Sequence, residues 1–467
     1  MKAIVKRYIF SLLSLGLLLS SCESAVDGIN TDPNHVNTEQ VDAGLYVNTP
    51  ELALASDFCG LYSRLSALWT GQLFGTNQVP LMHYNYQVTE STFDFNGYHN
   101  VITQCQHIQK SAPDNLFYQG ITRVMEAMLF GTYASFYGDV PCSEVGIEDT
   151  PKFDEQKDVF EYSQKLLDAA VDDLKSLNHV EYLQDYFYSG SATKWIEAAY
   201  TLKARFYMIT KDYDSAYKSA LNGISSDDNT MYFRPVDDNL TTDKNYYYTY
   251  NSIIQGIGTV NQDGDSCYLF QLMKARQNAK TDETARMAYY TLIPSEPTSN
   301  KGFFGPLEPE ALVSYAENQL ILAEAGARTQ SFSVGLAALN VWRQYLNDGG
   351  CANSTYRTLS HRYEAYTADD FKMGGLLNTD GLDQDRALLR EIIRERYISG
   401  FTTFMPFDDA RRLRGTGETD IAVDIPLNTT SASTQPERFL YPSDEMLSNP
   451  NAPEEPGLYT PTDVNKK

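Results

Sequence analysis

The chain has few basic residues and little cysteine, and both shortages exclude classes of function. Its 37 Lys and Arg stand against 61 Asp and Glu, which gives a formal net charge of −24. A surface with that balance repels nucleic acid and anionic lipid headgroups, so we exclude both as direct partners. The six cysteines are scattered and never spaced as Cys-x-x-Cys. This pattern indicates neither a disulfide framework nor a zinc site, and we expect buried, unpaired thiols after Cys22.

Sequence motifs of catalysis are missing as well. The chain has no His-Glu-x-x-His, no Gly-x-Ser-x-Gly, no phosphate-binding loop and no dinucleotide fingerprint. Its six His are never paired at i,i+4, as metal ligands on a helix would be. Carboxylates are abundant, but the sequence singles out no pair for glycoside hydrolysis. We therefore predict a binding protein and not an enzyme, with no cofactor; a surface-anchored hydrolase of polysaccharide or peptide is the alternative.

Long apolar runs are missing too, apart from one at the N-terminus that is too short to span a bilayer. Basic residues precede the apolar stretch 9–19, an order typical of a signal peptide. The stretch ends in Leu19-Ser20-Ser21-Cys22, which resembles a bacterial lipobox, where the cysteine receives a diacylglyceryl group. We predict a lipoprotein signal peptide over 1–21 and a lipidated Cys22 as the mature N-terminus. The lipid anchor would be the only contact with the membrane.

Helical periodicity dominates the remainder of the chain. Apolar spacing and capping residues predict helices over about 114–137, from an Asp154 cap to about 177, 191–209, 213–224, 309–329, 331–348 and 385–399. Three stretches with little helical period, rich in Asn, Asp, Gly, Thr and Tyr, separate them: 70–100, 226–307 and 349–382. We predict a mostly α fold in which tetratricopeptide-like helical pairs form a scaffold with long aromatic-rich loop insertions. An extended lead-in over 22–50 would precede a single helical domain over 51–467.

Aromatic residues make up 12% of the chain, and Tyr outnumbers Phe. Tyrosine combines an apolar face with a polar tip, which suits hydrated ligands such as sugars or extended peptides. Two stretches place aromatics among Asn, Asp and Gln, and we predict that they bind ligand through Trp69, Asn77, Tyr84, Tyr86, Tyr246, Tyr247 and Tyr248. The alternative is that these side chains pack in the core or along one face of a short strand.

A weaker pattern concerns metal. Asn261, Asp263 and Asp265 alternate oxygen ligands in a Gly-containing loop, faintly like a calcium loop. The glycine is at the wrong position and no distal Glu closes the pattern. We therefore predict no metal site.

Several ordered blocks carry a family resemblance. They are Tyr137-Gly138-Asp139-Val140-Pro141, Pro151 to Gln156, Gly190 to Arg205, Tyr315 to Ala325, Glu391 to Arg396 and Gln435 to Pro442. Together they resemble the SusD/RagB family of nutrient-binding outer-membrane lipoproteins from Bacteroidetes. In the block Glu391 to Arg396, the alternating Glu and Arg also predict a partly buried ion-pair network.

The resemblance implies a fold built on four tetratricopeptide-like pairs and a place on the outer membrane, facing the cell exterior. It also implies that the protein captures a glycan or oligopeptide and delivers it to a TonB-dependent transporter of the SusC/RagA type. A purely structural tetratricopeptide-like scaffold that binds proteins is the second alternative. The tyrosine run at 246–248 favours the nutrient binder, because a scaffold has no need of it.

Overall fold

The computed structural model describes residues 43–467 except 178–183, 237–242, 255–266 and 294–296. The predicted signal peptide, Cys22 and most of the predicted lead-in lie outside the described residues, as does the calcium-like stretch at 261–265. What is described belongs to one unit, Ala43–Lys467. None of its helices has the length and apolar character needed to cross a membrane.

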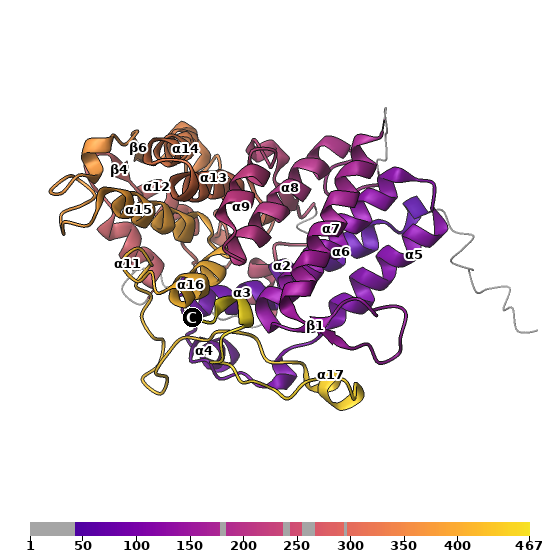
Figure 1. Cartoon of the computed structure of the whole chain (residues 1–467). Coiled ribbons are helices and arrows are strands. Elements are labelled where there is room, and N and C mark those ends of the chain that lie inside the picture. Colours follow the sequence, from indigo (N-terminus) through magenta and orange to yellow (C-terminus); the bar gives the residue numbers. More distant parts are fainter. Residues whose placement is uncertain (1–42, 178–183, 237–242, 255–266, 294–296) are drawn as a thin grey trace, which may run out of the picture. The chain divides into compact units, whose positions relative to one another are not determined.

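Four pairs of consecutive helices form the scaffold (Figure 1). Within each pair the two helices pack against each other: α6 (Leu116–Tyr137) with α7 (Gln156–Lys175), α8 (Ala192–Ile209) with α9 (Tyr213–Ala220), α13 (Tyr315–Thr329) with α14 (Phe332–Tyr345), and α15 (Gln384–Ser399) with α16 (Met405–Thr416). Neighbouring pairs also touch, since α7 packs on α8 and α13 on α15. The predicted mostly α fold is confirmed.

Side-chain caps explain where several of these helices begin. Asn115 accepts hydrogen bonds from the backbone N–H groups of Phe117 and Tyr118 at the start of α6. Ser191 accepts one from the N–H of Lys194, so the predicted cap of α8 is confirmed. Such caps satisfy N–H groups that have no partner inside the helix. Serine also caps both helices of the third pair: Ser314 caps α13 and Ser331 caps α14.

Three predicted boundaries are wrong. Asp154 does not cap α7; it lies in β2 (Phe153–Asp154), which pairs with β1 (Val140–Pro141), and its carboxylate accepts a hydrogen bond from Ser143. The short helix α9 ends at Ala220 and not near 224. The helix predicted from 309 begins only at Tyr315, because residues before the cap form β5 (Glu310–Val313), antiparallel to β3 (Met231–Phe233).

The predicted insertions hold short elements of their own. They are too short to show a periodicity in the sequence. They are α4 (Gln78–Tyr84), α10 (Tyr246–Tyr248), α11 (Tyr268–Ala275), α12 (Thr284–Tyr290), and β4 (Thr281–Asp282) paired with β6 (Arg362–Tyr363). Outside them lie α2 (Asn48–Cys59), α3 (Leu61–Trp69), α5 (Thr103–Ser111) and α17 (Ser443–Ser448).

The core is rich in aromatic side chains. Phe439 lies at its centre, with ring centroids 4.5 Å from Phe136 and 5.2 Å from both Trp69 and Phe93. The helices α6 and α8 approach closely at Gly131, where a Cβ atom would lie 2.3 Å from the ring of Phe206. Five cysteines are free and buried, as predicted: Cys59, Cys105, Cys142, Cys267 and Cys351.

The predicted ion-pair network around α15 is present for Glu391, Glu395 and Arg396, where it is buried more completely than expected, whereas Arg394 makes no ion pair with the described residues. Glu395 contacts Arg276 and Arg286, each at 2.7 Å. Arg396 contacts Asp409 at 2.7 Å and Glu324 at 3.2 Å. All these side chains are less than 10% exposed. Charges at such depth are tolerated only when paired and hydrogen-bonded, so this network fixes how α15 sits on its neighbours.

Candidate ligand pocket

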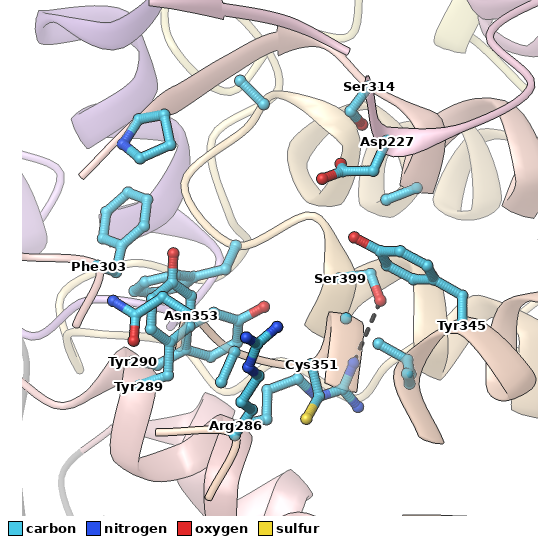
Figure 2. Close-up of a pocket in the computed structure, with 18 of the residues that line it drawn as sticks. Asp227, Arg286, Tyr289, Tyr290, Phe303, Ser314, Tyr345, Cys351, Asn353 and Ser399 are labelled. Carbon is cyan, nitrogen blue, oxygen red and sulfur yellow. Dashed lines mark hydrogen bonds between the residues drawn. The ribbon is translucent and has the colours of Figure 1, made fainter. Parts of the chain in front are cut away.

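A cavity of about 510 Å³ opens where two of the predicted insertions meet the helical pairs (Figure 2). The insertion 226–307 contributes Tyr232 of β3 and residues of α12. The second contributes the chain after α14, from Gly349 to Arg357. The turn between α15 and α16, residues 399–403, completes the wall. The size suits a small part of an extended ligand, such as one or two sugar rings.

Aromatic rings form two sides of this pocket. On one side, Tyr290 lies 4.3 Å from Phe401, and Phe303 lies 5.0 Å from Phe401, both between ring centroids. On the opposite side lies Tyr345 (Figure 2). Its ring stacks on that of Trp342, with the centroids 5.0 Å apart and the planes at 29°. Flat apolar faces on two sides, with room between them, define a slot for a ligand that has flat apolar faces of its own.

Polar groups lie between the rings. Glu308 accepts hydrogen bonds from the hydroxyl of Tyr289 at 2.8 Å and from the amide of Asn353 at 3.0 Å. Burial raises the pKa of Glu308, and these two hydrogen bonds oppose the rise. Asp227 accepts a hydrogen bond from the hydroxyl of Tyr232 at 2.8 Å. Carboxylate and amide oxygens of this kind can accept hydrogen bonds from ligand hydroxyls.

One charged side chain of the pocket lining, Arg286, is neutralised by carboxylates outside the lining. Arg286 is buried and is held by Glu283 and Glu395, both at 2.7 Å. Its guanidinium therefore shapes the floor of the pocket and does not act as a free cation. In the described part of the chain, no group of three or more His, Cys, Asp or Glu side chains is placed to hold a metal.

The first predicted stretch lies outside this pocket. Trp69 ends α3 and is 1% exposed; its indole N–H donates to the carbonyl of His83 at 3.0 Å. Tyr86 is also buried, and its hydroxyl accepts from the backbone N–H of Asn428 at 3.0 Å. Tyr84 is half-buried against Phe74, and Asn77 is exposed just before α4. Ligand binding by these residues stays a prediction.

The second stretch lies directly behind the pocket wall. Tyr247 is buried, shares a hydrogen bond of 2.6 Å with Ser63 of α3, and packs 5.4 Å from Phe303. Tyr246 is half-buried and Tyr248 is buried. The structure thus brings both predicted stretches against α3, yet none of the seven predicted side chains lines the cavity.

The pocket residues themselves were missed by sequence reasoning. Tyr289 and Tyr290 end a seven-residue helix, and Tyr345 ends α14, so each fits an ordinary helical pattern. The only available signal was their position, because Tyr289 and Tyr290 fall inside the predicted insertion 226–307 and Tyr345 lies just before the insertion 349–382.

Comparison with known proteins identifies the class. The SusD-like family model described as "Starch-binding associating with outer membrane" matches residues 39–442. The chain belongs to this SusD-like family, whose members are binding proteins associated with the outer membrane. None of the curated proteins matches the chain.

Solved structures share the fold. A SusD/RagB family protein from Bacteroides thetaiotaomicron is 19% identical with a TM-score of 0.64, covering 88% of this chain and 95% of its own. A SusD homolog from Bacteroides fragilis is 16% identical with a TM-score of 0.62, covering 90% and 99%. A chitin-binding SusD homolog from Flavobacterium johnsoniae is 17% identical with a TM-score of 0.60, covering 86% and 92%. At these identities the likeness establishes the fold alone.

Proposed function

We propose that this protein is a cell-surface lipoprotein that captures a glycan in the aromatic pocket and delivers it to a TonB-dependent outer-membrane transporter of the SusC/RagA type. The observation that carries the proposal is the slot between Tyr345 and the Tyr290–Phe401 side, in a chain whose family is described as starch-binding. The chitin-binding relative supports a saccharide over an oligopeptide. The resemblance stated above supports the transporter as partner.

The pocket offers both kinds of contact that a sugar needs. The C–H faces of a pyranose ring pack on aromatic rings, and its hydroxyls require hydrogen-bond partners when they leave water. Tyr345 supplies an aromatic surface, while Glu308 and Asp227 supply acceptors. The described lining has three carboxylates, Asp227, Glu308 and Asp348, and two arginines, of which Arg286 is paired and Arg357 is exposed, so the hydroxyl groups of a sugar would find both acceptors and donors here.

Replacing Tyr345 with Ala is expected to weaken glycan binding by about 1–3 kcal/mol, or about 5- to 150-fold in Kd, because an aromatic anchor is lost. Isothermal titration calorimetry against a panel of soluble neutral oligosaccharides and peptide mixtures measures this. Tyr84→Ala is the matched control, since Tyr84 is half-buried and outside the pocket. Unchanged affinity in Tyr345→Ala together with a loss in Tyr84→Ala would move the binding site to α4.

The proposed lipid anchor at Cys22 can be tested separately from ligand binding. Metabolic labelling with a fatty-acid probe is expected to mark the wild type and leave Cys22→Ala unlabelled, because Cys22 is the only cysteine of the lipobox-like sequence. Membrane fractionation should then release the variant, since the acyl chains would supply the membrane affinity. Equal labelling of both proteins would refute the anchor while leaving ligand binding by the pocket untouched.

A further inference from the structure

A second cavity, of about 460 Å³, lies between the end of α11, the loop 376–380 and α15. It shares no lining residue with the aromatic pocket among the described residues. Its wall carries three arginines, Arg276, Arg390 and Arg394, although the whole chain has a net charge of −24. Such a concentration of positive charge on an acidic protein requires a local explanation.

Two of the three arginines already have partners. Arg276 contacts three buried carboxylates, those of Glu283, Glu391 and Glu395, at 2.6–3.0 Å. Arg390 holds Asp380 through two hydrogen bonds, of 2.6 and 2.8 Å. The Nε of Arg390 nevertheless stays buried without a hydrogen-bond partner among the described residues.

The third arginine has no such partner. Arg394, one turn after Arg390 on α15, is half-buried and makes no hydrogen bond, ion pair or ring contact with the part of the chain that the structure describes. Burial lowers the pKa of Arg394; Glu391 opposes this, and the charges of Arg390 and Arg276 lower it further. A half-buried guanidinium that lies near Glu391 as well as Arg390 and Arg276, and whose donors have no partner among the described residues, is a position that a bound anion would stabilise.

The carboxylates of the cleft do not meet this need. Two of them, Asp380 and Glu391, line the cleft with the three arginines, but Asp380 is engaged by Arg390 and Glu391 by Arg276. Arg276 is paired in addition with Glu283 and Glu395, so the carboxylates near the cleft are engaged by other arginines, and Arg394 is left without a hydrogen bond or ion pair among the described residues. Polar side chains of Gln277 and Thr379 line the same cavity.

We propose that this cleft binds an oxyanion, a carboxylate or a sulfate group of the kind that acidic sugars carry, with Arg394 as the principal contact. The planar fork of a guanidinium matches two oxygens of such a group. This site shares no lining residue with the proposed glycan pocket among the described residues, so the two sites can be tested independently.

Calorimetric titration with sodium sulfate and with sodium galacturonate, at ionic strength held constant with sodium chloride, tests the proposal. We expect saturable binding by the wild type and a loss of at least tenfold in affinity in Arg394→Gln, with partial retention in Arg394→Lys. Arg234→Gln is the matched control, because Arg234 is exposed and lines neither cavity. Binding of galacturonate but not sulfate would assign the site to sugar acids; binding of both would assign it to oxyanions generally.

Two outcomes would overturn the proposal. One is the absence of saturable binding of either anion by the wild type up to about 50 mM. The other is an equal loss in Arg394→Gln and Arg234→Gln, which would mean that anions only screen the surface. Thermal unfolding distinguishes an anion-binding role of Arg394 from a structural one. Because Arg394 has no ion pair among the described residues, Arg394→Gln should leave Tm unchanged or raised. A lowered Tm in Arg394→Gln, with anion affinity intact, would make Arg394 a structural residue.

Discussion

Replacing Glu324 with Gln is expected to lower the free energy of unfolding by about 3–5 kcal/mol, because buried cations would lose their counter-charge. Glu324 is fully buried in α13 and contacts Arg412 at 2.5 Å, Arg328 at 2.8 Å and Arg396 at 3.2 Å. Asp409 also faces Arg396 and Arg412 but cannot replace the missing charge. Urea denaturation at pH 7, followed by circular dichroism, measures the change.

The matched control is Asp214→Asn, which breaks an exposed i,i+4 pair with Lys218. That change should cost at most about 0.5 kcal/mol, because water screens exposed pairs. The arginine contacts outweigh burial and hold the pKa of Glu324 at about 2. Its stabilising contribution is therefore complete above about pH 4.5 and is lost as the pH falls toward 2. Equal stability of Glu324→Gln and the wild type at pH 7 would contradict the prediction.

Replacing Glu310 with Gln should have the opposite sign and stabilise the protein by about 2–4 kcal/mol at pH 8. Burial raises the pKa of Glu310 to about 8, against the opposing effects of the Tyr246 N–H and Arg64. One carboxylate oxygen accepts from that N–H at 2.7 Å, and the other is buried with no partner in the described structure. Glutamine keeps the acceptor and removes the charge.

The pH dependence provides the internal test. A raised pKa means that the unfolded state gives up its proton first, near pH 4.5, so the wild type loses stability as the pH rises from there through 8. The advantage of Glu310→Gln should therefore be small at pH 4 and grow toward pH 8. Glu161→Gln, at an exposed position of α7, should show no such growth. A stability difference that does not change with pH would mean that Glu310 is ionised throughout.

The sequence predicted the helical pairs because their signals are local. Ser191 lies next to the N–H groups that it caps, and Gly138 ends α6 at a positive φ of 89°. The strand β5 was mistaken for a helix because its pairing with β3 joins segments far apart in the chain. Propensity and periodicity cannot reveal such a partner.

The pocket was harder to predict for the same reason. Its aromatic side depends on Tyr290 meeting Phe401, and its polar part on Asn353 meeting Glu308, both across long stretches of chain. The tyrosines at 246–248 drew attention by composition, but composition does not distinguish an exposed ring from Tyr247, which supports the wall from behind. The sequence indicated which residue types of α15 would form the ion-pair network. It did not indicate that Arg276, just after α11, and Arg286 of α12 would be their partners.

The polar contacts behind the pocket wall affect how much conformational entropy a ligand would cost on binding. The side chain of Asn245 donates to the carbonyls of Phe303 and Glu308, and Ser63 donates to the carbonyl of Thr402. These contacts tie the wall residues Phe303, Glu308 and Thr402 to the start of α10 and to α3. Binding of a ligand against these described segments would then cost little conformational entropy, because they are already held in place. A pre-organised slot of this kind favours rapid capture and selects among sugars by their rigid shape.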